Sequence, residues 1–398
     1  MKLDLLYELQ APKPWGKPHP YGQREAEQKS YFDAIEQVKL ADKLGYGTAW
    51  FVEHHFREGR SHCPAPEVMI GALSQITDNI RLGFGVTLTP HPFRHPVLNA
   101  ERVATADLLS RGRVEWGTGR STALERIALG VKDEESRAQW QEAIEIIVKA
   151  WEQERLEVDT PFVKFPALPR GDWEPARAIT PKPYQDPHPP CWVACVSDES
   201  VELAAKLGLG MLSLTIQLPV DTLAARIERY REASKNATPI TRVVNNRVAP
   251  YTLVHCAPSM PEAEKYDVWG SVAWWYTHLI DFAIEWELPP MSDEDLKQRF
   301  PNLEPARNGT FDPRVFADQD MIIVGDVEQC TDKIERYQRV GCDAILCYMQ
   351  FGHLSHEEIM TSIELLGTKV IPRLEKEAKS FAVGSPASDA LQSAAAGG

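Results

Sequence analysis

The sequence predicts an α/β protein that folds as a (β/α)8 TIM barrel with insertions. Eight segments with the composition of buried strands are separated, for the most part, by segments with apolar residues at helical spacing. This alternation implies parallel strands, and eight repeats favour a closed barrel over an open sheet. A doubly wound open sheet would usually carry a glycine-rich dinucleotide fingerprint after its first strand, but residues 10–14 read QAPKP.

The expected strands and helices follow one another in a regular order. A helix is expected before Gly45 because Phe32, Ile35 and Val38 share one helical face and a glycine commonly ends a helix. Pro66 marks the first turn of the next helix. The expected strands cover residues 3–9, 48–52, 80–88, 114–117, 192–196, 211–215, 245–255 and 344–349. The expected helices cover residues 30–44, 66–77, 96–110, 137–152, 198–207, 220–235 and 356–366.

One domain is predicted over residues 1–380, with two insertions in the alternating pattern. Residues 153–190 are rich in proline, and residues 256–320 are rich in aromatic side chains. Long irregular insertions in compact domains usually form lids or binding loops, so residues 256–320 are a candidate lid. Residues 381–398 are rich in serine, alanine and glycine and are expected to be a disordered tail.

The composition narrows the class of partner. The chain has 398 residues, of which 43% are hydrophobic, and a net charge of −14 without any cluster of basic residues. Nucleic acid and anionic membrane surfaces are therefore not expected as partners. No stretch approaches the roughly 20 apolar residues that a membrane span requires. The seven scattered cysteines do not suggest a disulfide framework, so a cytoplasmic setting is expected.

Functional side chains of a barrel enzyme lie where strands end, and the second strand ends in a histidine pair. His54 and His55 point to opposite faces of an extended chain, so one of them is expected in the site. A general base or a hydrogen-bond donor to a ligand fits better than a metal ligand, because consecutive residues rarely converge on one ion. The plainer alternative is a structural histidine, and no metal site is predicted.

The fourth and fifth strands end in groups that suit an anion. Arg120 follows Gly117 and Gly119, which would let the backbone approach a ligand, and arginine binds phosphate with two parallel hydrogen bonds. Ser197 and Ser200 open a helix, whose free N–H groups attract anions. Alone, each motif could equally be a tight turn or a helix cap. On neighbouring strands, they predict a shared phosphate site.

The aromatic insertion carries the candidate substrate pocket. Its members are Trp269, Trp274, Trp275 and His278. Trp275, Leu279, Phe282 and Trp286 have helical spacing, which favours an ordinary buried helix face. The density of aromatic residues in a long insertion leaves a lid or an apolar pocket wall as the alternative.

The chain resembles the bacterial luciferase-like flavin-dependent monooxygenases over nearly its whole length. The most specific block is residues 48–56, TAWFVEHHF. Residues 95–101, 109–113, 117–120, 187–194 and 325–328, with the turn at Ser197, follow in the same order as in the family. Luciferase proper has a cysteine where this chain has Gly119. The acidic residue that often precedes the phosphate serine in the family is absent from this chain. Both departures argue against light emission.

The resemblance implies a cofactor and roles for individual residues. The cofactor would be reduced FMN, supplied by a separate NAD(P)H:flavin reductase. His54 would be the catalytic histidine, with His55 beside the cofactor. Arg120, Ser197 and Ser200 would bind the FMN phosphate. The backbone of Thr87 and Leu88, sometimes with a non-proline cis peptide, would face the flavin ring.

The resulting functional prediction is an FMNH2-dependent two-component monooxygenase. It would transfer oxygen from O2, through a flavin peroxide, to a small to medium apolar organic substrate, and the resemblance implies a homodimer. One alternative is a deazaflavin-dependent oxidoreductase on the same barrel, which the residues 53–56, EHHF, disfavour. The other is a non-catalytic flavin-binding protein, which the intact His54 disfavours.

Overall fold

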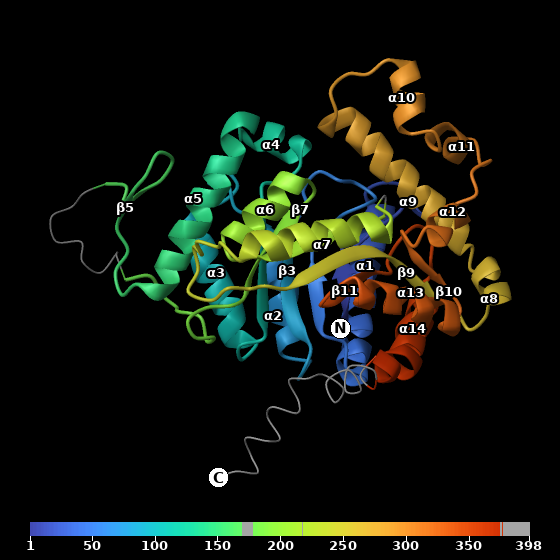
Figure 1. Ribbon diagram of the computed structural model, residues 1–398, viewed down its shortest axis with the longest axis horizontal. Helices are drawn as coiled ribbons and strands as arrows, with labels where there is room; N and C mark the ends of the chain where they lie inside the picture. The colour runs from blue at the N-terminus through green and yellow to red at the C-terminus, as the bar shows by residue number, and fades with distance from the viewer. Residues whose placement is uncertain (169–177, 217, 375, 377–398) are drawn as a thin grey trace, which may run out of the picture.

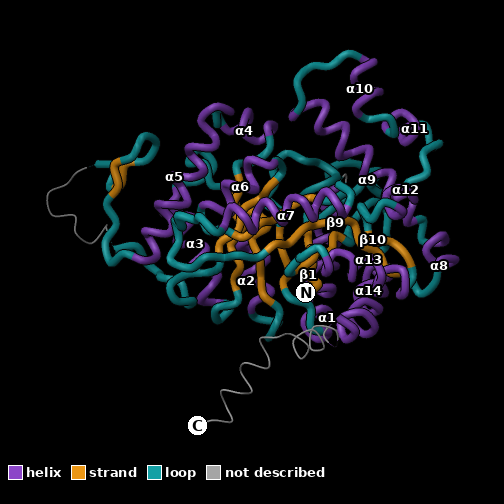
Figure 2. The backbone as a smooth tube through the Cα atoms, viewed as in Figure 1, coloured by secondary structure: helices purple, strands orange, loops and turns teal. Residues whose placement is uncertain are grey.

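The computed structural model describes residues 1–168, 178–216, 218–374 and 376. The predicted tail, residues 381–398, lies outside this range. Eight parallel strands close into a barrel, and helices surround it (Figures 1 and 2). The predicted (β/α)8 barrel is therefore confirmed. The barrel strands are β1 (Lys2–Tyr7), β2 (Thr48–Phe51), β3 (Arg81–Leu88), β4 (Val114–Gly119), β7 (Cys191–Cys195), β8 (Gly210–Leu214), β9 (Val248–Cys256) and β11 (Ala344–Tyr348).

The ring closes because the long strand β9 pairs with β8 through its first half and with β11 through its middle. Its last residues pair with a short extra strand, β10 (Ile323–Gly325). The outer helices are α1 (Tyr21–Leu44), α2 (Pro66–Ser74), α3 (Pro96–Leu109), α4 (Ala123–Leu129), α5 (Asp133–Glu152), α6 (Asp198–Lys206), α7 (Val220–Ser234), α13 (Val327–Arg339) and α14 (His356–Leu365), which continues into the π-helical turn η3 (Leu366–Val370).

Several elements were not predicted, or not in full, and three helices around the barrel show why. Helix α1 begins at Tyr21 rather than at residue 30, because its first turns are polar and show no apolar period. Helix α4 is short and capped, with Glu125 and Arg126 as its buried residues. Helix α13 buries Cys330, Ile334 and Tyr337 at helical spacing. The first turns of α1 and the short helix α4 lack an apolar period, whereas the apolar period of α13 was overlooked.

The two insertions lie on opposite sides of the barrel (Figure 1). The described part of the first contains the hairpin β5 (Val158–Asp159) and β6 (Lys164–Phe165). The second is helical, and no helix in the described part of the chain is long and apolar enough to cross a membrane. Its elements are α8 (Met260–Lys265), α9 (Val268–Phe282), the π-helical turn η2 (Ala283–Glu287), α10 (Asp293–Arg299), α11 (Leu303–Arg307) and α12 (Arg314–Asp318).

Charged groups close the end of the barrel where the strands begin. The Glu115 carboxylate accepts hydrogen bonds from Arg81, Trp192 and Arg247 at 2.6–3.0 Å. Asp4 accepts from the Trp50 indole at 2.9 Å, and burial raises the pKa of its carboxyl from 3.8 to about 7. This end carries a structural network, which leaves the opposite end, where the strands finish, for chemistry.

Candidate active site

His54 lies just after the end of β2, and both nitrogens of its ring form hydrogen bonds. Its Nδ1 donates to Glu125 Oε1 at 2.8 Å, and Arg57 Nη1 donates to its Nε2 at 2.9 Å. A carboxylate only accepts and a guanidinium only donates, so this arrangement requires a neutral imidazole with its hydrogen on Nδ1. The lone pair on Nε2 is thus the one that can take a proton, once Arg57 releases it.

Glu125 holds this histidine from the first turn of α4. Its side chain is fully buried and also accepts from the backbone N–H of His55 and of Thr122 and from the hydroxyl of Ser121. Burial alone would raise the pKa of this carboxyl. The hydrogen bonds from His54, Ser121 and Thr122 oppose burial, and the pKa of Glu125 lies well below its usual value. Glu125 therefore stays ionised and positions His54.

A second cluster of charged side chains lies beside Arg57, Glu125 and His54, inside the mouth of the barrel. Arg60 Nε donates to Glu8 Oε2 at 3.1 Å, and the Tyr348 hydroxyl donates to the same oxygen at 3.2 Å. All three side chains are buried. Arg57 is buried too, and burial, reinforced by the neighbouring charge of Arg60, lowers the pKa of its guanidinium to about 10.

The end of the third strand has a half-buried pair, Gly85 and Val86, followed by the buried pair Thr87 and Leu88, for which contact with the cofactor stays a prediction. The non-proline cis peptide joins Gly85 to Val86, two residues before the predicted Thr87–Leu88 pair. Thr87 and Leu88 are buried, and the Leu88 N–H donates to Glu53 Oε2 at 2.9 Å. Since the amide of Leu88 already has a partner, the half-buried Gly85 and Val86 form the accessible part of this strand end.

Gly117 and Gly119 serve packing in this structure. A Cβ at Gly117 would meet the Phe84 carbonyl oxygen at 2.3 Å, and one at Gly119 would meet a methyl of Val86 at 2.6 Å. These glycines make room for the neighbouring strand β3, including the side chain of Val86. These residues are therefore glycines because β3 packs closely against β4, whereas the sequence had suggested that they let a ligand approach the backbone.

Arg120 follows β4 in a setting that suits an anion. Its Nη1 donates to the Ser136 hydroxyl at 3.1 Å, and it forms no ion pair with any of the described residues. Burial, together with the charges of Arg126 and Arg137, lowers its pKa. Arg126 and Arg137 pair with Asp133 and Glu199, so Arg120 is the arginine of this group that is left without an ion pair among the described residues.

The serine-capped helix follows the neighbouring strand β7. The Ser197 hydroxyl accepts from the Ser200 N–H at 3.3 Å, which caps α6, and the Ser200 hydroxyl accepts from the Ser197 N–H at 3.0 Å. Arg137 donates to Glu199 at 3.2 Å in the first turn of the same helix. Hence the arginine group and the start of α6 are neighbours, and their charge and N–H groups fit a phosphate.

The aromatic residues of the second insertion divide between core and mouth. Trp275 is fully buried and Trp269 is 7% exposed, both within a packed cluster. Trp274 is half-buried and its ring lies 3.9 Å from that of the exposed His278. Trp269 and Trp275 are thus buried, as the helical spacing indicated for Trp275. A substrate-pocket role for Trp269, Trp274, Trp275 and His278 stays a prediction.

Helix α9 nevertheless reaches the proposed catalytic group. The Phe282 ring lies 3.8 Å from the guanidinium carbon of Arg57, and Trp275 lies 4.8 Å from that of Arg60. In η2, Glu287 accepts from the N–H of Ala123 at the start of α4. The insertion thus touches the histidine loop and the helix that carries Glu125.

His55 contacts the carboxylate that anchors β3. Its Nε2 lies 3.5 Å from Glu53 Oε1, and its side chain is 24% exposed. Arg94 lies 3.7 Å from the same oxygen. The two histidines therefore diverge as expected, His54 towards Glu125 and His55 towards Glu53.

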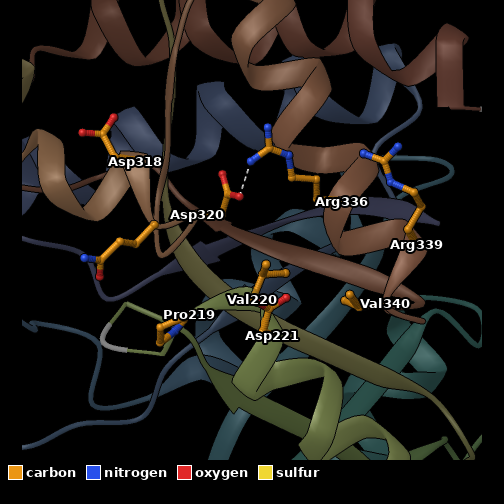
Figure 3. A pocket seen from close by; sticks show the side chains of 9 residues that line it. Pro219, Val220, Asp221, Asp318, Asp320, Arg336, Arg339 and Val340 are labelled. Atoms are coloured by element: carbon orange, nitrogen blue, oxygen red, sulfur yellow. Dashed lines mark hydrogen bonds and ion pairs between the residues drawn. The ribbon is translucent and has the colours of Figure 1, made fainter.

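A separate open groove lies outside the barrel mouth, between the start of α7 and the end of α13 (Figure 3). Its volume is about 490 Å³, and Pro219, Asp318 and Arg339 are among its lining residues. The carboxylate of Asp320 at its edge already pairs with Lys333 and Arg336. The groove includes none of the side chains around His54.

Sequence reasoning overlooked Glu125, Arg57 and Arg60. Glu125 carries a recognisable signal, because Thr122 followed three residues later by glutamate is a capping box. Nothing in the sequence distinguishes Arg57 and Arg60 from surface arginines. Their burial depends on Glu8, Tyr348 and the insertion, which are far away in the chain.

Comparison with known proteins shows the family of this chain. The family model for luciferase-like monooxygenase matches residues 15–344. The chain belongs to this family. As a member of this family of monooxygenases, the protein is an oxidoreductase. It is 23% identical over 360 residues to the oxygenase component of the flavin-dependent trigonelline monooxygenase of Acinetobacter baylyi, an alignment covering 88% of this chain and 91% of that one.

Solved structures share the barrel of this luciferase-like monooxygenase. The oxygenating constituent of 3,6-diketocamphane monooxygenase of Pseudomonas putida, a complex with FMN, has a TM-score of 0.69 at 20% identity. The alignment covers 94% of this chain and 98% of that one. A coenzyme F420-dependent tetrahydromethanopterin reductase of Methanopyrus kandleri has a TM-score of 0.66 at 18% identity, over 94% and 99% of the chains. At these identities the likeness shows the fold.

Proposed function

We propose that this protein is the oxygenase component of a two-component, FMN-dependent monooxygenase. It would take reduced FMN from a separate NAD(P)H:flavin reductase and use O2 to oxygenate a small to medium organic substrate with an apolar body. We further propose that it works in the cytoplasm as a homodimer. The relatives that bear on this are an oxygenase component named as flavin-dependent and an FMN complex.

The observation that carries the proposal is the anion cradle after β4 and β7. Arg120 lacks an ion-pair partner among the described residues, and two further arginines and the start of α6 adjoin it. A cofactor phosphate would supply the missing negative charge. These residues therefore fit the phosphate end of FMN, and the bound flavin would supply the reducing electrons that activate O2.

His54 would provide the proton handling. With its hydrogen held on Nδ1 by Glu125, the imidazole presents the Nε2 lone pair at the barrel mouth. Phe282 and Trp275 from α9 cover the same region, and excluding water there would favour oxygen transfer over loss of hydrogen peroxide.

A deazaflavin is the second candidate cofactor, because an F420-dependent reductase shares the barrel. The arginine–serine cradle alone does not separate the two, since both cofactors carry phosphate. The two cofactors differ in their ring system and in whether the reaction needs O2, and these two properties distinguish the candidates.

The test is an anaerobic titration with reduced FMN, reduced riboflavin and reduced F420. We expect FMN to bind more tightly than riboflavin, and Arg120→Ala to weaken FMN binding by about 2 kcal/mol without changing riboflavin binding. Arg102→Ala, which removes an exposed arginine paired with Glu67, is the matched control. Equal affinity for FMN and riboflavin would refute the phosphate cradle, and tight binding of F420 alone would favour the second candidate.

A further inference from the structure

Two buried guanidinium groups in the barrel mouth have N–H groups without partners. Arg57 Nε and Arg60 Nη1 are both buried, and neither has a hydrogen-bond partner among the described residues. The two charges also repel each other, which contributes to the lowered pKa of Arg57. Buried donors without acceptors are costly, and like charges side by side add to that cost.

The nearby carboxylates Glu8 and Glu125 offset part of the charge of Arg57, but neither accepts a hydrogen bond from it. Glu8 binds Arg60 and the Tyr348 hydroxyl. Glu125 binds His54 and the N–H and hydroxyl groups at the start of α4. Among the described residues, the Arg57 guanidinium contacts the neutral Nε2 of His54 and the face of the Phe282 ring. Buried arginines are usually bonded directly to a carboxylate, and Arg57 has no such direct bond among the described residues.

The surroundings indicate what kind of molecule would supply that partner. Aromatic rings of Phe282 and Trp275 pack against the two guanidinium groups, and Tyr251 is half-buried beside them. The mouth is reached by solvent, since the His54 side chain is 15% exposed. An organic molecule with an apolar body and a negatively charged end would match both features.

This set lies apart from the phosphate cradle. Arg57 and Arg60 belong to the loop after β2, and their partners Glu8 and Tyr348 come from β1 and β11. Arg120 and Ser197 follow β4 and β7, and β3 lies between β2 and β4 in the sheet. One phosphate group held by the second set would leave the first set without an anion.

We propose that Arg57 and Arg60 bind a carboxylate of the organic substrate, between the flavin site and helix α9. This proposal rests on the proposed function for the reaction that follows, and it amends the expected substrate from a purely apolar molecule to an apolar body with one carboxylate. The planar forks of the two arginines suit a carboxylate because each can offer it parallel N–H donors. Binding there would draw Arg57 from His54 Nε2, leaving that lone pair available beside the substrate.

The first test locates an anion directly. Crystals of the protein, with and without FMN, would be grown with bromide in place of chloride, and anomalous diffraction would map the bromide. We expect a peak within hydrogen-bonding distance of Arg57 Nε and Arg60 Nη1. Absence of a peak there in both crystals would overturn the proposal.

The second test measures carboxylate recognition by calorimetry. The probes are benzoate and phenylacetate, with benzamide and phenylacetamide as uncharged molecules of the same shape. We expect the carboxylates to bind at least about ten-fold more tightly than the amides, and Arg57→Gln to remove this preference. Arg57→Lys should retain part of it, and Arg102→Gln, at an exposed arginine, should leave it unchanged.

The outcomes separate this inference from the proposed function. A panel in which no carboxylate binds more tightly than its amide would overturn the carboxylate site, as would an unchanged preference in Arg57→Gln. Reduced FMN is titrated against the same variants, and we expect its affinity to be unaffected by Arg57→Gln. A protein that binds carboxylates through Arg57 but fails to bind FMN would keep this inference and refute the proposed cofactor.

Discussion

Replacing Glu125 with glutamine tests whether an ionised carboxylate organises the active site. One carboxylate oxygen accepts from His54 Nδ1 and the His55 N–H, and the other accepts from the Thr122 N–H and the Ser121 hydroxyl. Glutamine keeps one acceptor and turns the other into a donor. In either orientation of the amide, a backbone N–H faces another donor and loses its acceptor.

The cost follows from these contacts. Hydrogen bonds to charged groups contribute about 1.5–3 kcal/mol each, and a buried donor left without an acceptor costs about 1–3 kcal/mol. We expect Glu125→Gln to lower the free energy of unfolding at pH 7 by about 2–4 kcal/mol, measured by urea denaturation. Glu287→Gln is the matched control, because Glu287 accepts from Ala123 N–H in the same helix turn but is partly exposed.

The pH dependence gives a second, independent readout. The folded-state pKa of Glu125 lies below its usual 4.5, so its stabilising effect is present above pH 4.5 and is lost as pH falls through the folded value. The stability difference between wild type and Glu125→Gln should therefore shrink by up to about 1.4 kcal/mol for each pH unit below 4.5. A variant within about 0.5 kcal/mol of wild type at pH 7, with no change in the difference on acidification, would refute the reasoning.

Three further predictions concern the barrel interior and the insertion. The pKa of Asp4 rises from 3.8 unfolded to about 7 folded, so its stabilising contribution is complete below pH 3.8 and disappears by about pH 7. Relative to Asp4→Asn, wild type should lose about 1.4 kcal/mol per pH unit between pH 4 and 7, and urea denaturation that shows parallel pH curves would contradict this. Trp275→Ala, at a fully buried site, should cost about 3–5 kcal/mol in unfolding free energy. Trp274→Ala, at a half-buried site, should lower the free energy of unfolding by about 1 kcal/mol or less. It should also change substrate choice or the release of hydrogen peroxide. If both stay unchanged, Trp274 is an ordinary packing residue.

The local sequence was enough to predict the barrel, because strand composition and helical periodicity are properties of neighbouring residues. The eight predicted strands correspond to the barrel strands β1, β2, β3, β4, β7, β8, β9 and β11. The same strand predictions placed His54 and Arg120 at strand ends, because both residues follow a run of residues with the composition of a buried strand. The short polar face of α4 gave no such period, so the helix carrying Glu125 was not predicted.

What the sequence by itself determined about this protein is its fold class, its family resemblance and the strand ends at which His54, Arg120 and Ser197 lie. Only the tertiary structure decided which partner each group has. It paired His54 with Glu125, 71 residues away, and buried Arg60 against Glu8, 52 residues away. It also buried Leu88, left Val86 half-buried and placed Phe282 over Arg57. The physical reason is that burial and charge pairing depend on side chains from distant segments, whereas periodicity depends on adjacent residues.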